Sequence, residues 1–276
     1  MKNIFFQFLF NKYKKIFIKL KYKMSSCIAF CFLNYDIIIR YDIWNKFFEN
    51  IDKSKYIVFI HPKFIKDFNL LYTFPYNIVK NRVVTTGKDN ITIVKATLQL
   101  LKESYYANEN ISHFIFLSQS CVPLYSFDKL YNVITNFKLS VISHIDYNKK
   151  ERYNQLSQLL KKYINYNEFI KQQPNMILIE SDVQLLLSND LTNHYSQMIC
   201  PDEHYFINNL LYIFKKNIIK KQTHFCNNRL ERTQALEFKN VHNIFIKEVR
   251  KYGFLFMRKI AKESIVDINF LLDNSV

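Results

Sequence analysis

The stretch Cys27-Ile-Ala-Phe-Cys-Phe-Leu33 decides the fold class, because it is short, apolar and rich in residues that favour β-strands. A second stretch of this kind runs from Tyr56 to Ile60, before His61-Pro62 ends it. Between the two, apolar residues recur at helical spacing from 43 to 51. A strand, a helix and a strand in this order, with both strands apolar throughout, predict buried parallel strands joined by a crossover helix.

The same alternation continues along the chain. Further strands are expected at 114–117, 141–145 and 176–179, and helices at 91–101, 127–134, 151–171 and 183–187. Ser126 precedes one of these helices as its N-cap, and Pro201 suits the first position of a helix that reaches Phe214. The sequence therefore predicts an α/β fold with a mostly parallel sheet flanked by helices.

The chain is strongly basic: 39 Lys and Arg against 23 Asp and Glu among 276 residues give a formal net charge of +16. Such a surplus favours anionic partners, among them nucleic acid, an anionic membrane and phosphorylated ligands. Lys, Asn, Ile, Phe and Tyr are over-used together, however, so part of the excess reflects an AT-rich codon composition. Because the chain has two glycines, no Gly-rich loop can hold phosphates, which excludes Walker-type and dinucleotide-binding motifs.

The cysteines and histidines give no sign of a metal site. Five cysteines, at 27, 31, 121, 200 and 226, lack the paired short spacings of a zinc site and the density of a disulfide scaffold. A reducing compartment is the simplest interpretation. The seven histidines are equally dispersed, without a His-Glu-x-x-His pattern. We therefore predict no metal and no other cofactor.

The N-terminal residues 1–23 form a basic amphipathic segment, which we set apart from a single domain over 24–276. Its apolar run, Ile4 to Phe10, is too short to span a bilayer, and several lysines follow it. A helix on a membrane surface and an ordinary helix packed on the domain both fit this pattern. With no transmembrane span or signal peptide recognised, we expect a cytoplasmic or peripherally membrane-associated protein.

Two carboxylates and an imidazole follow Pro201 at the expected start of a helix, in the order Asp202, Glu203, His204. A helix N-terminus stabilises negative charge, which makes these carboxylates candidates for a functional role. The alternative is that both carboxylates simply complement the helix dipole, which is common in proteins.

Small polar residues follow the expected strand at 114–117, among them Ser118 and Ser120. Ligands of open α/β sheets bind outside the carboxyl ends of the strands, which makes both serines candidates for substrate binding, although an ordinary loop fits equally well. Near the C-terminus Arg258 and Lys259 follow an apolar run. A partly buried cation needs an anionic partner, whereas an exposed pair would extend into solvent.

In this order and spacing, the three motifs resemble the Core-2/I-branching β-1,6-N-acetylglucosaminyltransferases and their plant, bacterial and viral relatives. The resemblance extends over nearly the whole chain, and the Ser-Cys-Val-Pro loop and the Pro-Asp-Glu-His-Tyr stretch are its most specific parts. It implies a GT-A-type nucleotide-sugar fold, an inverting transfer and independence from divalent metal. The chain agrees with the last point, since it contains no Asp-x-Asp to bridge a metal and a diphosphate.

The resemblance also implies roles for particular residues. Glu203 matches the catalytic base, and Lys259 matches a lysine on the donor diphosphate. The matching arginine is Arg232 or Arg229, of which we prefer Arg232. Three tryptophans that are usual in the family are replaced, by Thr86, by Pro174 and by Asn227 or Asn228; the last replacement is on the acceptor side and leaves the acceptor open.

These observations predict an inverting, metal-independent glycosyltransferase that takes a UDP-sugar and passes the sugar to a saccharide or glycoprotein acceptor. N-acetylglucosamine and xylose are the favoured sugars. Peripheral membrane contact through 1–23 is a further expectation. Two alternatives remain: a basic nucleic-acid-binding protein that uses the many aromatic residues for stacking, and a family member that binds saccharide without turnover.

Overall fold

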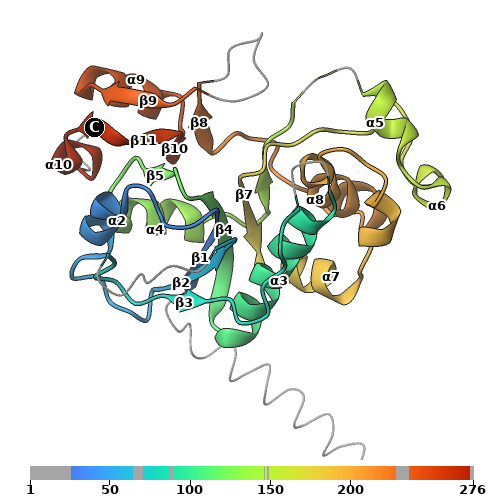
Figure 1. The fold of residues 1–276 in the computed structure, drawn as a ribbon, viewed down its shortest axis with the longest axis horizontal. Coiled ribbons are helices and arrows are strands. Elements are labelled where there is room, and N and C mark those ends of the chain that lie inside the picture. The colour runs from blue at the N-terminus through green and yellow to red at the C-terminus, as the bar shows by residue number, and fades with distance from the viewer. Residues whose placement is uncertain are drawn as a thin grey trace, which may run out of the picture.

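The computed structural model describes residues 26–64, 71–86, 90–145, 147, 149–227 and 236–273. Its centre is a six-stranded sheet in the order β3-β2-β1-β4-β7-β6 (Figure 1). These strands are β1 (Cys27–Asn34), β2 (Tyr56–Pro62), β3 (Asn77–Ile78), β4 (Ile111–Ser118), β6 (Val141–Ile142) and β7 (Met176–Ile179). The first four in the order are parallel to one another, whereas β7 runs antiparallel to both β4 and β6. The predicted α/β fold with a mostly parallel sheet is confirmed.

Both faces of the sheet are buried, which explains why its strands are apolar throughout. Along β1 the side chains alternate: Phe30 and Phe32 pack on one face, and Ala29 and Cys31 on the other. The first face is covered by α2 (Tyr41–Phe48) and α4 (Phe127–Thr135). The second is covered by α3 (Thr92–Ala107), α7 (Glu180–Ser188) and α8 (Tyr205–Asn208) (Figure 1).

The start of α4 agrees with the sequence in detail. The Ser126 side chain accepts a hydrogen bond from the Lys129 backbone N–H at 3.4 Å, as an N-cap does. The single long helix predicted over 151–171 is wrong, because the chain forms two short helices there, α5 (Lys150–Asn154) and α6 (Gln158–Lys161). Ser157 separates them: its hydroxyl accepts from the Leu160 N–H at 3.3 Å and so begins a new helix.

The helix expected after Pro201 is present but irregular. It begins as the 3₁₀ turn η2 (Pro201–Glu203), continues as α8 and ends as the π-helical turn η3 (Asn209–Ile213), while another 3₁₀ turn, η1 (Thr192–Tyr195), precedes it. Pro201 occupies the predicted first position, where its missing N–H costs no hydrogen bond.

Two small sheets, which the sequence patterns did not predict, add the C-terminal part of the chain. One contains β5 (Val122–Pro123), β10 (Phe256–Arg258) and β8 (His224–Cys226), and the other β9 (Phe238–Val241) and β11 (Ile260–Val266). The last two helices are α9 (Asn243–Lys251) and α10 (Ile268–Leu271). Because β10 pairs with β5, which follows closely after β4, the C-terminal strand lies beside the carboxyl end of the central sheet.

Candidate functional site

A cavity of about 200 Å³ lies at the carboxyl ends of β1 and β4. Leu33 of β1 and Ser118 of β4 both line it, and they are direct partners in the strand register. The strand order reverses here, since β2 and β3 lie on one side of β1 and β4 on the other. Open α/β sheets bind their ligands at such a switch point, which makes this cavity the candidate site.

The predicted serines take different places at this end of the sheet. Ser118 lines the cavity, and its hydroxyl lies 3.4 Å from that of Ser120 and 3.2 Å from the Cys121 sulfur. Ser120 is buried, and its carbonyl oxygen accepts a hydrogen bond from the Ile260 N–H at 3.1 Å. Ser118 is thus available to a ligand, while Ser120 joins the loop to the start of β11.

Arg258 reaches the cavity from β10. Its Nη1 donates a 2.6 Å hydrogen bond to Asn175 Oδ1, and Asn175 in turn donates to the Phe116 carbonyl at 3.2 Å. The Arg258 Nε is buried without a hydrogen-bond partner among the described residues. Because Arg258 also lines the cavity, its guanidinium can provide a positive charge for an anionic ligand there.

The sequence indicated Arg258 and Lys259 as a pair, and the resemblance gave the diphosphate role to Lys259, but it is Arg258 that lines the cavity. Lys259 is partly buried and is not among the cavity-lining residues; its carbonyl accepts from the Phe238 N–H at 2.8 Å. The adjacency of the two cations after an apolar run was the available signal. Arg229 and Arg232, the other predicted diphosphate ligands, lie outside the described residues.

The two neighbouring carboxylates of η2 have different surroundings. Asp202 lines the cavity. Glu203 forms an ion pair instead, with its Oε2 3.0 Å from Lys171 Nζ, and its carbonyl accepts from the Gln172 N–H at 2.8 Å. The segment that leads into β7 therefore holds the Glu203 side chain and main chain in place.

Burial shifts the pKa values of two residues in this turn. Burial, followed by the neighbouring Glu203 carboxylate, raises the pKa of Asp202 to about 7. Burial lowers the pKa of His204 to about 4, so its imidazole is neutral near pH 7. The His204 ring nitrogens lie 2.9 Å from the Ile170 carbonyl and 3.2 Å from the Tyr147 hydroxyl. These contacts fix the His204 side chain, which thereby stabilises the turn.

Within the described ranges, no group of three or more His, Cys, Asp or Glu side chains is arranged to hold a metal ion. Nor does any helix in the described part of the chain have the length and apolar character needed to cross a bilayer. The basic segment 1–23 lies outside the described residues.

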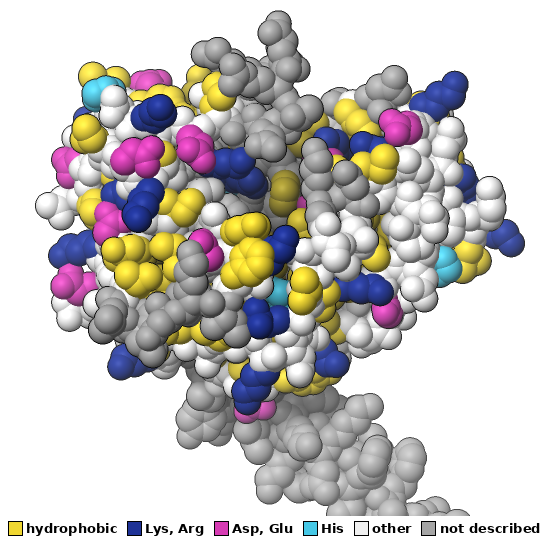
Figure 2. All heavy atoms as spheres, viewed as in Figure 1, with side chains coloured by type: hydrophobic (Ala, Val, Ile, Leu, Met, Phe, Trp, Pro, Cys, Tyr) yellow, Lys and Arg dark blue, Asp and Glu magenta, His cyan; other side chains and the backbone are white. Residues whose placement is uncertain are grey.

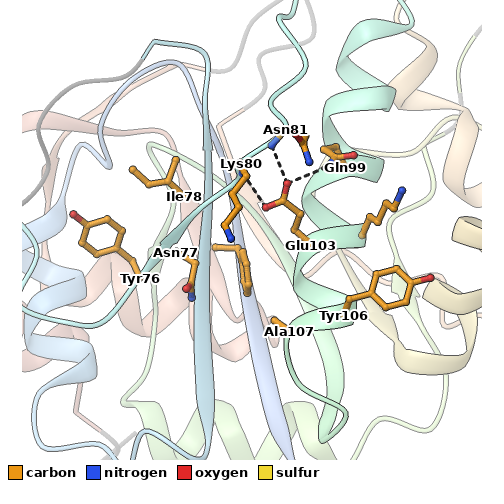
Figure 3. Close-up of a pocket in the computed structure, with 11 residues that line it drawn as sticks. Tyr76, Asn77, Ile78, Lys80, Asn81, Gln99, Glu103, Tyr106 and Ala107 are labelled. Carbon is orange, nitrogen blue, oxygen red and sulfur yellow. Dashed lines mark hydrogen bonds between the residues drawn. The ribbon is translucent and has the colours of Figure 1, made fainter.

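A wider hollow of about 710 Å³ lies at the β3 edge of the sheet and contains none of the predicted site residues (Figure 3). Both oxygens of its central carboxylate, Glu103, already accept hydrogen bonds from the protein itself. One oxygen accepts from the Lys80 N–H at 2.9 Å, and the other from the Asn81 N–H at 3.1 Å and the Gln99 side chain at 2.9 Å. These bonds hold the turn after β3, so Glu103 has a structural role, and the smaller cavity remains the candidate site.

The chain belongs to the Core-2/I-branching enzyme family, whose match spans residues 28–251. A curated relative, glycosyltransferase BC10 of Oryza sativa subsp. japonica, is 28% identical over 133 residues, which cover 47% of this chain and 33% of the relative. The matched part is thus about a third of that relative's length.

Among solved structures, a WbbM bifunctional glycosyltransferase is 10% identical with a TM-score of 0.39, over 86% of this chain and 46% of the other. The galactosyltransferase LgtC, solved with donor and acceptor sugar analogues, is 10% identical with a TM-score of 0.39, over 87% of this chain and 84% of the other. Both similarities are distant, and the assignment of this chain depends on the family match.

Proposed function

We propose that this protein is an inverting glycosyltransferase that transfers a sugar from a UDP-sugar to a saccharide or glycosylated acceptor. One observation carries the proposal: in a chain of this family, a carboxylate turn and a guanidinium meet at the cavity beside the topological switch point. The turn offers a base, and the guanidinium offers a partner for the leaving diphosphate.

Arg258 is the first candidate for the donor phosphates. Its guanidinium is always charged and presents several N–H donors in a plane, which suits phosphate oxygens. Lys259 is proposed as a second cation, together with Arg232 or Arg229. Since the sequence has no Asp-x-Asp, we propose that these side chains take the place of a bridging metal. N-acetylglucosamine and xylose stay the favoured sugars.

Glu203 is the proposed base. As the acceptor oxygen forms its bond to the anomeric carbon, its proton passes to the Glu203 carboxylate. The bond between the anomeric carbon and the diphosphate oxygen breaks, and UDP leaves with the electron pair. Attack from the side opposite the leaving group inverts the anomeric configuration. Lys171, at 3.0 Å, pairs with the Glu203 carboxylate and holds it in place before the acceptor binds.

The test is Glu203→Gln, which keeps the size of the side chain but removes its ability to take a proton. We expect transfer to fall by about 10²–10⁴-fold, the usual range for a lost general base, with UDP binding unchanged. Glu248→Gln is the matched control, because Glu248 also pairs with a lysine, Lys251 at 2.6 Å, but on the exposed end of α9. Near wild-type transfer by Glu203→Gln would remove the glutamate from the mechanism.

The nucleic-acid alternative loses its main support in the structure. Many of the aromatic rings that could stack on bases are buried in the core around β1, including Phe30, Phe32, Trp44 and Phe127. Lys and Arg side chains are dispersed over the face seen in Figure 2 and form no continuous stripe there. Turnover by the wild-type protein in the assay above would also contradict the alternative of a saccharide-binding member without activity.

A further inference from the structure

The candidate cavity contains a carboxyl group for which the proposed mechanism has no use. Asp202 lines it, together with Ser118, Asn175 and Arg258. The proposed base, Glu203, pairs with Lys171 and is not among the residues that line the cavity. The carboxyl group that a ligand in this cavity meets is therefore that of Asp202.

The Asp202 carboxyl retains hydrogen-bonding capacity. It forms no ion pair with a described residue, and the nearby backbone N–H groups of its own turn, those of Asp202 and Glu203, favour its charged form. A carboxylate has about four lone-pair sites, so these N–H groups leave acceptor sites for a ligand. The 3₁₀ turn η2 holds the side chain at the cavity.

Cation and carboxyl together define the kind of ligand that fits. Arg258 brings its positive charge to the wall of the cavity, whereas Asp202 offers acceptor oxygens. A ligand that has an anionic group next to hydroxyl or amide N–H groups satisfies both. The cavity volume, about 200 Å³, is smaller than the roughly 300–1,000 Å³ of a typical small-molecule site. A cavity of this size suits one sugar ring rather than a whole nucleotide-sugar.

We propose that Asp202 binds the transferred sugar of the donor by accepting a hydrogen bond from one of its hydroxyl or amide N–H groups, and thereby selects which sugar the protein takes. This inference rests on the proposed function and adds the part of the donor that this cavity recognises. Arg258 contacts the phosphate next to that sugar, so the two side chains hold both ends of the bond that breaks. Asp202 is a specificity-determining residue, distinct from the base.

The test compares UDP with UDP-sugars, because UDP lacks the group that Asp202 contacts. Binding of UDP, UDP-N-acetylglucosamine, UDP-xylose and UDP-glucose to wild type and to Asp202→Ala is measured by calorimetry without acceptor. A lost hydrogen bond to a charged group corresponds to about 10–100-fold in affinity. We therefore expect Asp202→Ala, which has no acceptor, to bind the preferred UDP-sugar at least about 10-fold more weakly and UDP as wild type does. Asp202→Leu repeats the test with a side chain closer in size to aspartate.

Asp128→Ala is the matched control. Asp128 is an exposed carboxylate on α4 and is not among the residues that line the cavity, so its removal should leave sugar binding unchanged. The inference is overturned if both Asp202 variants bind UDP-sugar as wild type does, if they lose UDP and UDP-sugar equally, or if Asp128→Ala has the same effect. If wild type binds neither UDP nor any UDP-sugar, the proposed function itself fails.

Discussion

Asp202 and Glu203 are neighbours in sequence whose different surroundings suit different tasks. Glu203 has a lysine at 3.0 Å, whereas Asp202 has no described ion-pair partner and a pKa raised to about 7 by burial and by Glu203. Burial and a like charge thus perturb one of these adjacent carboxyl groups, whereas an ion pair with Lys171 holds the other.

The raised pKa of Asp202 predicts a pH-dependent cost in stability. Below about pH 4 the carboxyl is protonated in both the folded and the unfolded chain, so it costs nothing. As the pH rises from about 4 to 7, the unfolded chain releases this proton and the folded chain retains it, and folding stability is lost over that interval. Above about 7 the loss stays constant.

Replacing Asp202 with Asn should remove this loss. We expect the stability of Asp202→Asn relative to wild type to grow by about 1–3 kcal/mol between pH 5 and pH 8, since one pKa unit corresponds to about 1.4 kcal/mol. The measurement is urea unfolding followed by fluorescence of Trp44, the only tryptophan in the chain and a buried one. Asp128→Asn, at an exposed carboxylate on α4, is the control. A difference that does not change with pH would contradict the shift.

At the scale of elements, Arg250 joins the end of α9 to α10 and to the segment after β5. It is buried, its Nε donates to the Leu124 carbonyl at 2.7 Å, and its Nη2 donates to the carbonyls of Phe270 and Leu271, both at 3.0 Å. Its guanidinium also lies 4.9 Å from the centre of the Tyr125 ring. The Arg250 guanidinium of α9 thus donates to carbonyls of two other segments, the one after β5 and the end of α10.

Arg250→Lys should therefore be destabilising although it keeps the charge, because an ammonium cannot reproduce the planar fork. We expect a loss of about 2–4 kcal/mol in the free energy of unfolding, from two or more hydrogen bonds to a charged group. Urea unfolding followed by Trp44 fluorescence measures it. Arg152→Lys, at a partly exposed arginine with one contact to Glu151 at 3.4 Å, should change stability by less than about 1 kcal/mol. Equal effects of the two substitutions would contradict the structural role of Arg250.

At the scale of the whole molecule, the candidate site combines segments that are far apart in sequence. Ser118 comes from the end of β4, Asp202 from η2 and Arg258 from β10. The pairing of β10 with β5 brings Arg258 to the same end of the sheet as Ser118, because Met257 lies opposite Val122. Arg258, a fixed cation of the C-terminal strand β10, thus lies where a donor diphosphate is proposed to bind.

This arrangement predicts that donor turnover needs no divalent metal. With side-chain cations as the partners of the diphosphate, turnover of the preferred UDP-sugar in excess EDTA should stay within about twofold of the untreated rate, since no bridging ion has to be held. The measurement is UDP release with EDTA, and again after manganese is added. Loss of activity in chelator with recovery in manganese would show that a metal does bridge the donor.

Local sequence was sufficient for most of the central sheet and its helices. The apolar run at 27–33 predicted β1, the spacing after Tyr41 predicted α2, and Ser126 predicted the start of α4. Periodicity and capping depend on neighbours within a few positions, so they can be recognised in the sequence itself. The Ser-Cys-Val-Pro and Pro-Asp-Glu-His motifs also indicated the family, which the match over 28–251 confirms. The base role of Glu203 stays a prediction.

Only the tertiary structure decided how distant segments pair. In the structure β7 runs antiparallel to its neighbours, and two short helices take the place of the one expected at 151–171. The pairing of β10 with β5 likewise appears only in the structure. The tertiary structure also brought Arg258, rather than Lys259, to the cavity beside Asp202. The physical reason is that strand pairing and side-chain direction at a site depend on contacts between residues more than 100 positions apart, whose energies leave no periodic pattern in the local sequence.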